Sequence, residues 1–108
     1  MQLDFPIFTS GEIDGTVYLT RNGRTIPAGR VIVEVVDDRN RVVETTTTEY
    51  DGFYVISKIP LGRYRIRVSR QQMSELNLSA DEEPAFEITA DDQFESGIDF
   101  TLTQIIEQ

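Results

Sequence analysis

The chain has 108 residues, the size of a single domain, and it contains no cysteine and no histidine. These absences remove disulfides, thiolate metal sites, a cysteine nucleophile and the commonest general base, so we expect no enzyme and no cofactor. A formal net charge of -9 would repel nucleic acid, and no apolar run approaches the roughly 18 residues that span a bilayer. We therefore expect neither nucleic-acid binding nor direct membrane insertion.

The first half of the chain alternates apolar and polar residues with a period of two, which is typical of a small all-β sandwich or barrel. Strands are expected at residues 12–19, 30–37 and 41–48. The segment RNGRTIPAG between the first two strands is interpreted as a loop. Gly15 falls on the apolar face of the first strand, where a glycine often marks a bulge or a close neighbour.

The stretch EYDGFYVISKIPLGRYRIRVS, residues 49–69, has the densest pattern in the chain. Asp51-Gly52 predicts a type I′ hairpin turn, because both central positions of that turn need a positive φ. Pro60 is then expected to end the strand, and Gly62 to allow a tight reversal into the next one. The residues of this stretch that are expected to face the core are Tyr54, Ile56, Ile59, Tyr64, Ile66 and Val68.

The remainder of the chain has a less regular pattern. Residues 70–83 are expected to form a loop with one helical turn, which cannot continue through Pro84. Strands at 84–90 and 95–103 bring the count to seven. The inward residues expected outside the stretch 49–69 are Ile13, Val17, Leu19, Val31, Val33, Val35, Phe86, Ile88, Ile98, Phe100 and Leu102.

Three segments, GEIDGTVYL, IPAGRVIVEVVD and TTTTEYDGFYVISKIPLGRYRIRV, resemble the carboxypeptidase regulatory-like domain. The resemblance implies an all-β, seven-stranded transthyretin-like (prealbumin-like) Greek-key β-sandwich, related to the B-type repeats of Gram-positive adhesins. It implies a domain at residues 12–103, between an N-terminal extension or linker at 1–11 and a C-terminal tail at 104–108. The residues that carry the family motif are Thr48, Asp51, Gly52, Tyr54, Ile56, Ile59, Pro60, Gly62 and Tyr64.

The resemblance implies an accessory role, because family members are mostly non-catalytic modules of peptidases, outer-membrane transporters, pilus ushers and adhesins. It also implies an extracytoplasmic location, in the periplasm, at the outer membrane or on the cell surface, within a longer exported protein. The opening GEIDGTVYL is similar to a periplasmic domain of an outer-membrane usher-like protein. Adhesin repeats commonly form an isopeptide bond from a first-strand lysine, but the single lysine here is Lys58, so we expect no such bond.

Four groups of polar residues have both a ligand-binding and a structural interpretation. A hairpin turn favours the residue types of the first group, which could otherwise bind Ca²⁺. A solvated surface is the usual meaning of the second and third groups, which could otherwise bind a cation and an anion. The fourth group is a glycosylation sequon, a tripeptide that occurs often by chance. The groups are Asp37, Asp38 and Asn40; Asp81, Glu82 and Glu83 with Asp91 and Asp92; Arg63, Arg65 and Arg67; and Asn77-Leu78-Ser79.

Two classes of function remain. Phe53 and Val55 lie on the strand face opposite Tyr54 and Ile56, and solvent-facing apolar residues favour cover by another domain, a protein partner or the segment of residues 70–83. This predicts a structural or docking module whose partner interface contains Phe53 and Val55. The alternative is a carbohydrate- or peptide-binding module, in which Tyr18, the tyrosine at position 50 and the arginine row would bind the ligand.

Overall fold

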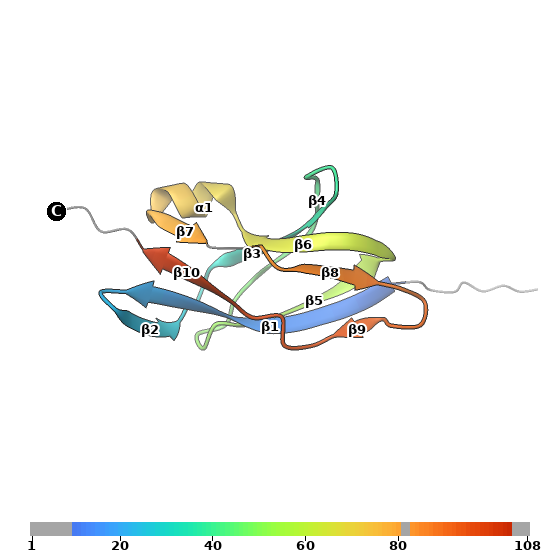
Figure 1. Ribbon diagram of the computed structural model, residues 1–108, viewed down its shortest axis with the longest axis horizontal. Coiled ribbons are helices and arrows are strands. Elements are labelled where there is room, and N and C mark those ends of the chain that lie inside the picture. Colours follow the sequence, from blue (N-terminus) through green and yellow to red (C-terminus); the bar gives the residue numbers. More distant parts are fainter. Residues whose placement is uncertain (1–9, 81–82, 105–108) are drawn as a thin grey trace, which may run out of the picture.

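The computed structural model of the chain describes residues 10–80 and 83–104 (Figure 1). Strands dominate this part of the chain, with one short helix between the sixth and seventh strands. The elements are β1 (Ser10–Arg21), β2 (Arg24–Pro27), β3 (Ile32–Asp37), β4 (Val42–Thr47), β5 (Phe53–Pro60), β6 (Gly62–Val68), α1 (Arg70–Glu75), β7 (Leu78–Ala80), β8 (Ala85–Ile88), β9 (Phe94–Glu95) and β10 (Phe100–Gln104).

The strands form two sheets that enclose the core between them. The first sheet has the order β2-β1-β10-β7, with β5 and β9 also paired to β1, and the second has the order β4-β3-β6-β8. Neighbours in the second sheet are antiparallel, whereas β1 pairs in parallel with both β9 and β10. This arrangement confirms the expected all-β, transthyretin-like sandwich.

Seven of the ten strands in the described residues lie where the sequence predicts strands, and the other three are short. β2 lies in the predicted loop, because Asn22 and Gly23 take positive φ values of 53° and 76° and turn the chain back along β1. β7 has three residues and β9 has two, which is too short for a period of two to be visible. The strand predicted at 95–103 is therefore divided, with only β10 forming a longer ladder.

The stretch 49–69 crosses between the two sheets, so its prediction as a β-hairpin is wrong. β4 and β6 lie in the second sheet, whereas β5 between them belongs to the first. The turn before β5 is closed by hydrogen bonds of 2.9 Å from Gly52 N to Glu49 O and from Glu49 N to Phe53 O. Gly52 has a φ of 79° but Asp51 does not take a positive φ, so the turn is not type I′. The dipeptide signals a reversal of the chain, but it does not determine which sheet receives the next strand.

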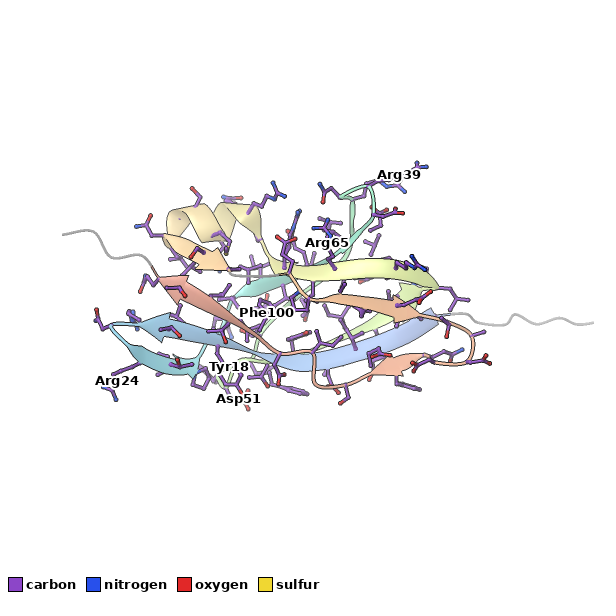
Figure 2. All side chains as sticks on the ribbon, in the orientation of Figure 1. Tyr18, Arg24, Arg39, Asp51, Arg65 and Phe100 are labelled. Atoms are coloured by element: carbon purple, nitrogen blue, oxygen red, sulfur yellow. The ribbon has the colours of Figure 1, made fainter. Side chains whose placement is uncertain are left out.

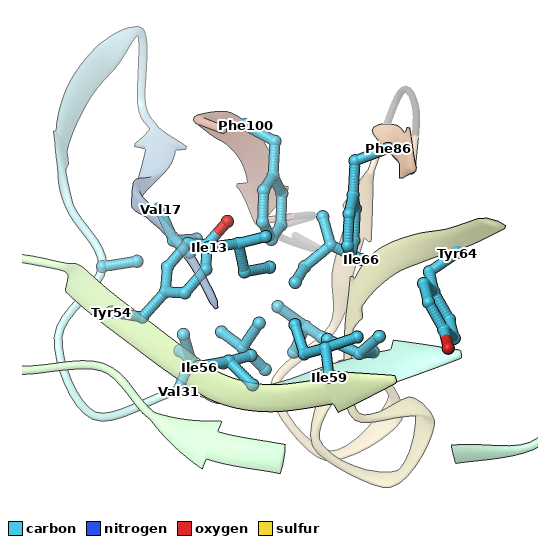
Figure 3. Packing of buried hydrophobic residues seen from close by; sticks show 14 of the residues in the cluster. Ile13, Val17, Val31, Tyr54, Ile56, Ile59, Tyr64, Ile66, Phe86 and Phe100 are labelled. Atoms are coloured by element: carbon cyan, nitrogen blue, oxygen red, sulfur yellow. The ribbon is translucent and has the colours of Figure 1, made fainter. Parts of the chain in front are cut away.

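The predicted inward residues form the core, with Leu19 and Ile98 partly buried at its margin (Figure 3). Val36 is also buried, but it lies outside the core cluster, beside a register irregularity between β3 and β4. Thr48 is the buried polar residue of the core. Its hydroxyl accepts a hydrogen bond from Val31 N at 3.0 Å and donates one to a backbone carbonyl at 2.8 Å, so it is fully satisfied.

β1 changes its neighbours near Gly15, where the chain between β9 and β10 passes over it. A Cβ atom on Gly15 would lie 1.9 Å from the carbonyl oxygen of Ile98, so only glycine fits at this crossing. Ile98 N donates to Asp14 O at 2.9 Å, and the Tyr54 hydroxyl donates to Ile98 O at 2.6 Å. The close neighbour expected at Gly15 is therefore confirmed, and it is the backbone of residue 98.

Tyr54 and Tyr64 are core residues, as the sequence predicts, with exposed fractions of 2% and 8%. The Tyr64 hydroxyl donates to Pro60 O at 2.7 Å, and its ring packs against Phe86 with a centroid separation of 5.6 Å. Burial raises the pKa of both phenols above the ordinary value, and the carboxylates of Asp99 and Asp14 raise the pKa of Tyr54 further. Burial therefore disfavours ionisation of both side chains in the folded protein.

We expect Gly52→Ala to destabilise the domain far more than Gly23→Ala. Both glycines have positive φ, so both substitutions carry a backbone cost of about 1 to 3 kcal/mol. Only at Gly52 would the new Cβ also collide, at 2.4 Å from Val17 O, whereas nothing lies within 4 Å of a Cβ on Gly23. Urea unfolding of both variants measures the difference. Equal losses of stability would show that the crossing from β4 to β5 tolerates a side chain.

The buried phenol of Tyr54 predicts a loss of stability at alkaline pH. Unfolded tyrosine ionises near pH 10, while the raised folded-state pKa keeps Tyr54 neutral. Its contribution is therefore complete below about pH 10 and is lost as the pH rises, by about 1.4 kcal/mol per pH unit. Tyr54→Phe should be less stable at pH 7, because Ile98 O loses its donor, but should decline less steeply above pH 10. Urea unfolding at a series of pH values measures both effects. The exposed control variant Tyr50→Phe should follow the wild-type curve of unfolding free energy against pH. If this curve fell as steeply for Tyr54→Phe as for the wild type, the buried Tyr54 phenol would not be the cause of the alkaline loss.

Candidate docking surface

Phe53 and Val55 lie on the outward face of β5. The strand alternates buried and exposed residues, and these two side chains are 39% and 41% exposed. In the antiparallel ladder with β1, Phe53 lies opposite Thr16 and Val55 lies opposite Asp14. Within the described residues, β5 pairs with β1 alone, so β5 forms part of the edge of the first sheet. Their orientation is the one that the sequence alternation predicts, and their role as an interface remains a prediction.

The helical segment of residues 70–80 packs elsewhere and leaves this face open. α1 begins after Ser69, whose side chain accepts from Gln72 N, and it packs against β7. Gln72 Oε1 also accepts a hydrogen bond of 2.7 Å from Ile32 N, which fixes the helix to the start of β3. The helical turn expected in this region is therefore present, but it does not provide cover for Phe53 and Val55.

Carboxylates lie next to the two apolar side chains, and each is fixed by hydrogen bonds. Asp51 Oδ1 accepts from Phe53 N at 3.1 Å, and Asp99 Oδ1 accepts from Thr16 N at 2.8 Å. Asp14 Oδ1 accepts from Ser96 Oγ and Gly97 N, at 2.9 and 3.0 Å. Figure 2 shows Asp51 and Tyr18 on the same side of the molecule. We call Phe53, Val55, Asp14, Asp51 and Asp99 the β5 face: two apolar side chains with an ordered acidic rim.

Each arginine of the row on β6 lies within ion-pair distance of an acid. The nitrogen–oxygen distances are 3.7 Å from Arg63 to Glu87, 2.6 Å from Arg65 to Glu83 and 3.0 Å from Arg67 to Glu34. Each acid lies on, or just before, a strand next to β6. These cross-strand pairs support the interpretation of the row as a charged strand face.

Asp37 holds the turn between β3 and β4, as expected for the first polar group. Its carboxylate accepts three hydrogen bonds of 2.9 Å, from Arg39 N, Arg41 N and Arg41 Nε. The backbone N–H of Arg41 is the main cause that lowers the pKa of Asp37. Asn40 Oδ1 accepts a hydrogen bond from Arg65. Asp37 and Asn40, two of the three residues proposed as Ca²⁺ ligands, therefore have partners within the protein.

The remaining polar candidates are the acidic group and the glycosylation sequon. Asp81 and Glu82 lie outside the described residues, and Asp91 and Asp92 are exposed. The neighbouring Asp92 carboxylate raises the pKa of Glu95, because it accepts a hydrogen bond from the protonated Glu95 side chain and repels its ionised form. Asn77 is exposed and takes a φ of 54° just after α1, a conformation that asparagine tolerates well. Across residues 10–80 and 83–104, no three histidine, cysteine or acidic side chains are grouped as metal ligands would be.

In the part of the chain that the structure describes, no helix has the length and apolar character needed to cross a lipid bilayer.

Lys58, the residue considered for an isopeptide bond, is exposed on β5. It has a φ of 62° and lies at a bulge opposite the segment between Gly11 and Ile13. Asp99 instead contacts Thr16, farther along β1.

Solved structures with a similar fold include pilins of Gram-positive bacteria. A minor pilin of Streptococcus agalactiae matches with a TM-score of 0.66 and 15% identity, over 94% of this chain and 48% of that chain. The major pilin subunit of Bacillus cereus matches with a TM-score of 0.63 and 13% identity, over 90% of this chain and 31% of that one. The Bacillus anthracis TIE protein gives a TM-score of 0.61 and 13% identity, over 90% and 18%. This chain thus spans less than half the length of each, and the likeness shows a shared fold.

Sequence comparison supplies the family. No curated protein sequence matches the chain significantly. The model of the carboxypeptidase regulatory-like domain family, however, matches residues 12–103. That match includes both sheets of the sandwich and the turn at Asp51-Gly52. The chain therefore belongs to the carboxypeptidase regulatory-like domain family.

Proposed function

We propose that this chain is a non-catalytic structural and docking module of a larger extracytoplasmic protein of the cell envelope or cell surface. The observation that carries the proposal is the β5 face, where two apolar side chains remain about 40% exposed inside an acidic rim. Family membership and the fold shared with pilins support this function, as does a sequence without histidine or cysteine. Fold likeness alone would be a weaker argument, because one fold serves many functions.

The positions of the chain ends suit a domain placed in series with others. Ser10 begins β1, whereas Gln104 follows Thr103, which pairs with Thr20 near the other end of the same strand. Figure 1 shows the two ends of the described chain at opposite ends of the sandwich. At about 3.3 Å per strand residue, the domain would add about 35 Å between its neighbours. We place the domain at residues 12–103, with residues 1–11 and 104–108 as its connections.

The chemistry of the β5 face defines its partner as a protein surface with an apolar contact and a basic rim. Burial of Phe53 and Val55 would provide the driving force, and Asp14, Asp51 and Asp99 would select positively charged neighbours. The carboxylates are already held by hydrogen bonds, so little side-chain entropy would be lost on binding. We assign this role to another domain of the parent protein.

The carbohydrate- or peptide-binding alternative gains less support. Tyr50 is 83% exposed, but the arginines expected to assist it are paired with Glu34, Glu83 and Glu87. Tyr18 is partly buried on β1. The arginine side chains assigned to a ligand would therefore have to leave their acid partners in order to bind it.

We expect the double variant Phe53→Ser, Val55→Thr to fold normally and to bind the rest of the parent protein at least about tenfold more weakly. Both side chains lie outside the core, so thermal unfolding should change little. The matched control is Ile32→Ser with Val42→Thr, which alters similarly exposed apolar residues on the second sheet. Calorimetric titration of the chain with the remainder of the parent protein compares the affinities. Equal affinity of both double variants, or unfolding of the first, would contradict the docking role of the β5 face.

A further inference from the structure

The C-terminal part of the described chain follows β1 in parallel along most of its length. Near the start, Glu12 N donates to Gln93 O at 2.8 Å, and the short strand β9 then pairs with residues 12 and 13. Near the end, β10 pairs with residues 17–20 of β1. We call this contact between residues 12–20 and residues 93–103 the terminal seam. It joins the first strand of the domain to the last.

Side chains close the gap in the middle of the terminal seam. Residues 96–99 do not form a ladder with β1, yet Asp14 accepts hydrogen bonds from Ser96 and Gly97. Asp99 accepts from Thr16 N at 2.8 Å, in place of a backbone carbonyl. The seam is therefore continuous, because two carboxylates and the Ile98 N–H bond to Asp14 O connect its two ladders.

Both strands of the seam are also anchored in the core. Ile13 and Val17 of β1 are at most 1% exposed, and Phe100 and Leu102 of β10 are at most 5% exposed. Beyond the ladder, Arg21 Nη1 donates to Gln104 Oε1 at 3.3 Å. Sliding one strand past the other would therefore break hydrogen bonds and displace buried apolar side chains together.

The direction of the seam determines how tension would act on it. The chain enters at the start of β1 and leaves at the end of β10, and these points lie at opposite ends of the sandwich (Figure 1). Tension between them would pull the two parallel strands past each other along their own axes. Hydrogen bonds between strands lie across those axes, so this shear would load them simultaneously. Tension applied at one end of the seam would instead break them one after another.

We propose that the terminal seam is a mechanical clamp that lets this domain carry tension between its two neighbours without unfolding. The clamp is non-covalent, since the only lysine, Lys58, is exposed on β5 at a distance along β1 from Asp99. Its biological use rests on the proposed function as a module in series within a surface protein. The clamp itself is a property of this chain alone, so it can be tested without a partner.

Single-molecule pulling in two directions tests the clamp directly. The full 108-residue chain is placed between marker domains and pulled through its ends, and a second form is pulled between Arg24→Cys and the C-terminus. The chain has no cysteine of its own, so the attachment is unique, and Arg24 is exposed at the end of the sandwich near Gln104. We expect an unfolding force at least about twofold higher for end-to-end pulling, since shear loads the seam at once. Equal forces in the two directions would overturn the proposal.

Two acid variants separate the clamp from global stability, because forced unfolding reports the unfolding barrier rather than the equilibrium. Asp99→Ala removes a seam contact, and Asp37→Ala removes a comparable carboxylate from a turn in the second sheet. Asp99→Ala should lower the end-to-end force, and Asp99→Asn, which keeps an accepting oxygen, should restore it. Asp37→Ala should lower the melting temperature without a matching loss of force. Equal losses of unfolding force in both alanine variants would overturn the clamp. The docking role of the β5 face is tested separately, because its failure would appear only in the binding titration.

Discussion

The fold depends on how β1 is shared between its neighbours. This strand has twelve residues and pairs with β5 and β9 in its first half and with β2 and β10 in its second. The exchange is possible because Gly15 has no side chain where the backbone of Ile98 passes. Tyr54 and Asp14 then satisfy the polar groups of the crossing residue. A side chain at this one position would separate the C-terminal segment from the rest of the first sheet.

The sequence predicts the layers of this fold better than its connections. Alternation of apolar residues identifies the core because strand side chains have a period of two, and Tyr54 and Tyr64 lie where that period places them. Asp51-Gly52 predicts a reversal, but a turn signal cannot show that β5 joins β1 instead of β4. Strands as short as β9 contain too few residues for any period. Thr48 is identified by the family motif, although its buried bridge between two backbone segments is visible only in the structure.

The sequence predicts only the part of the candidate site that follows from the alternation of apolar and polar residues. The exposure of Phe53 and Val55 follows from their places beside Tyr54, whereas the acidic rim gathers residues from β1, a turn and the C-terminal segment. Such a surface depends on topology, so no local motif contains it. The arginine row illustrates the reverse case, because its cations are regular in sequence but are paired with acids from neighbouring strands. Under the two proposals made above, the sandwich would combine load transmission through the terminal seam with docking through the β5 face, and neither role would require a catalytic group.

The central claim is that the terminal seam joins the first and last strands to the core as one cooperative unit. Native-state hydrogen exchange tests this claim most directly. The amides of Thr16 and Ile98 donate across the seam, to Asp99 and to Asp14. If the seam is part of the cooperative core, both amides should exchange only through global unfolding, with the same free energy as the buried amides of β3 and β6. Exchange of Ile98 and β10 at a much lower free energy, through local opening of the C-terminal segment, would contradict this account.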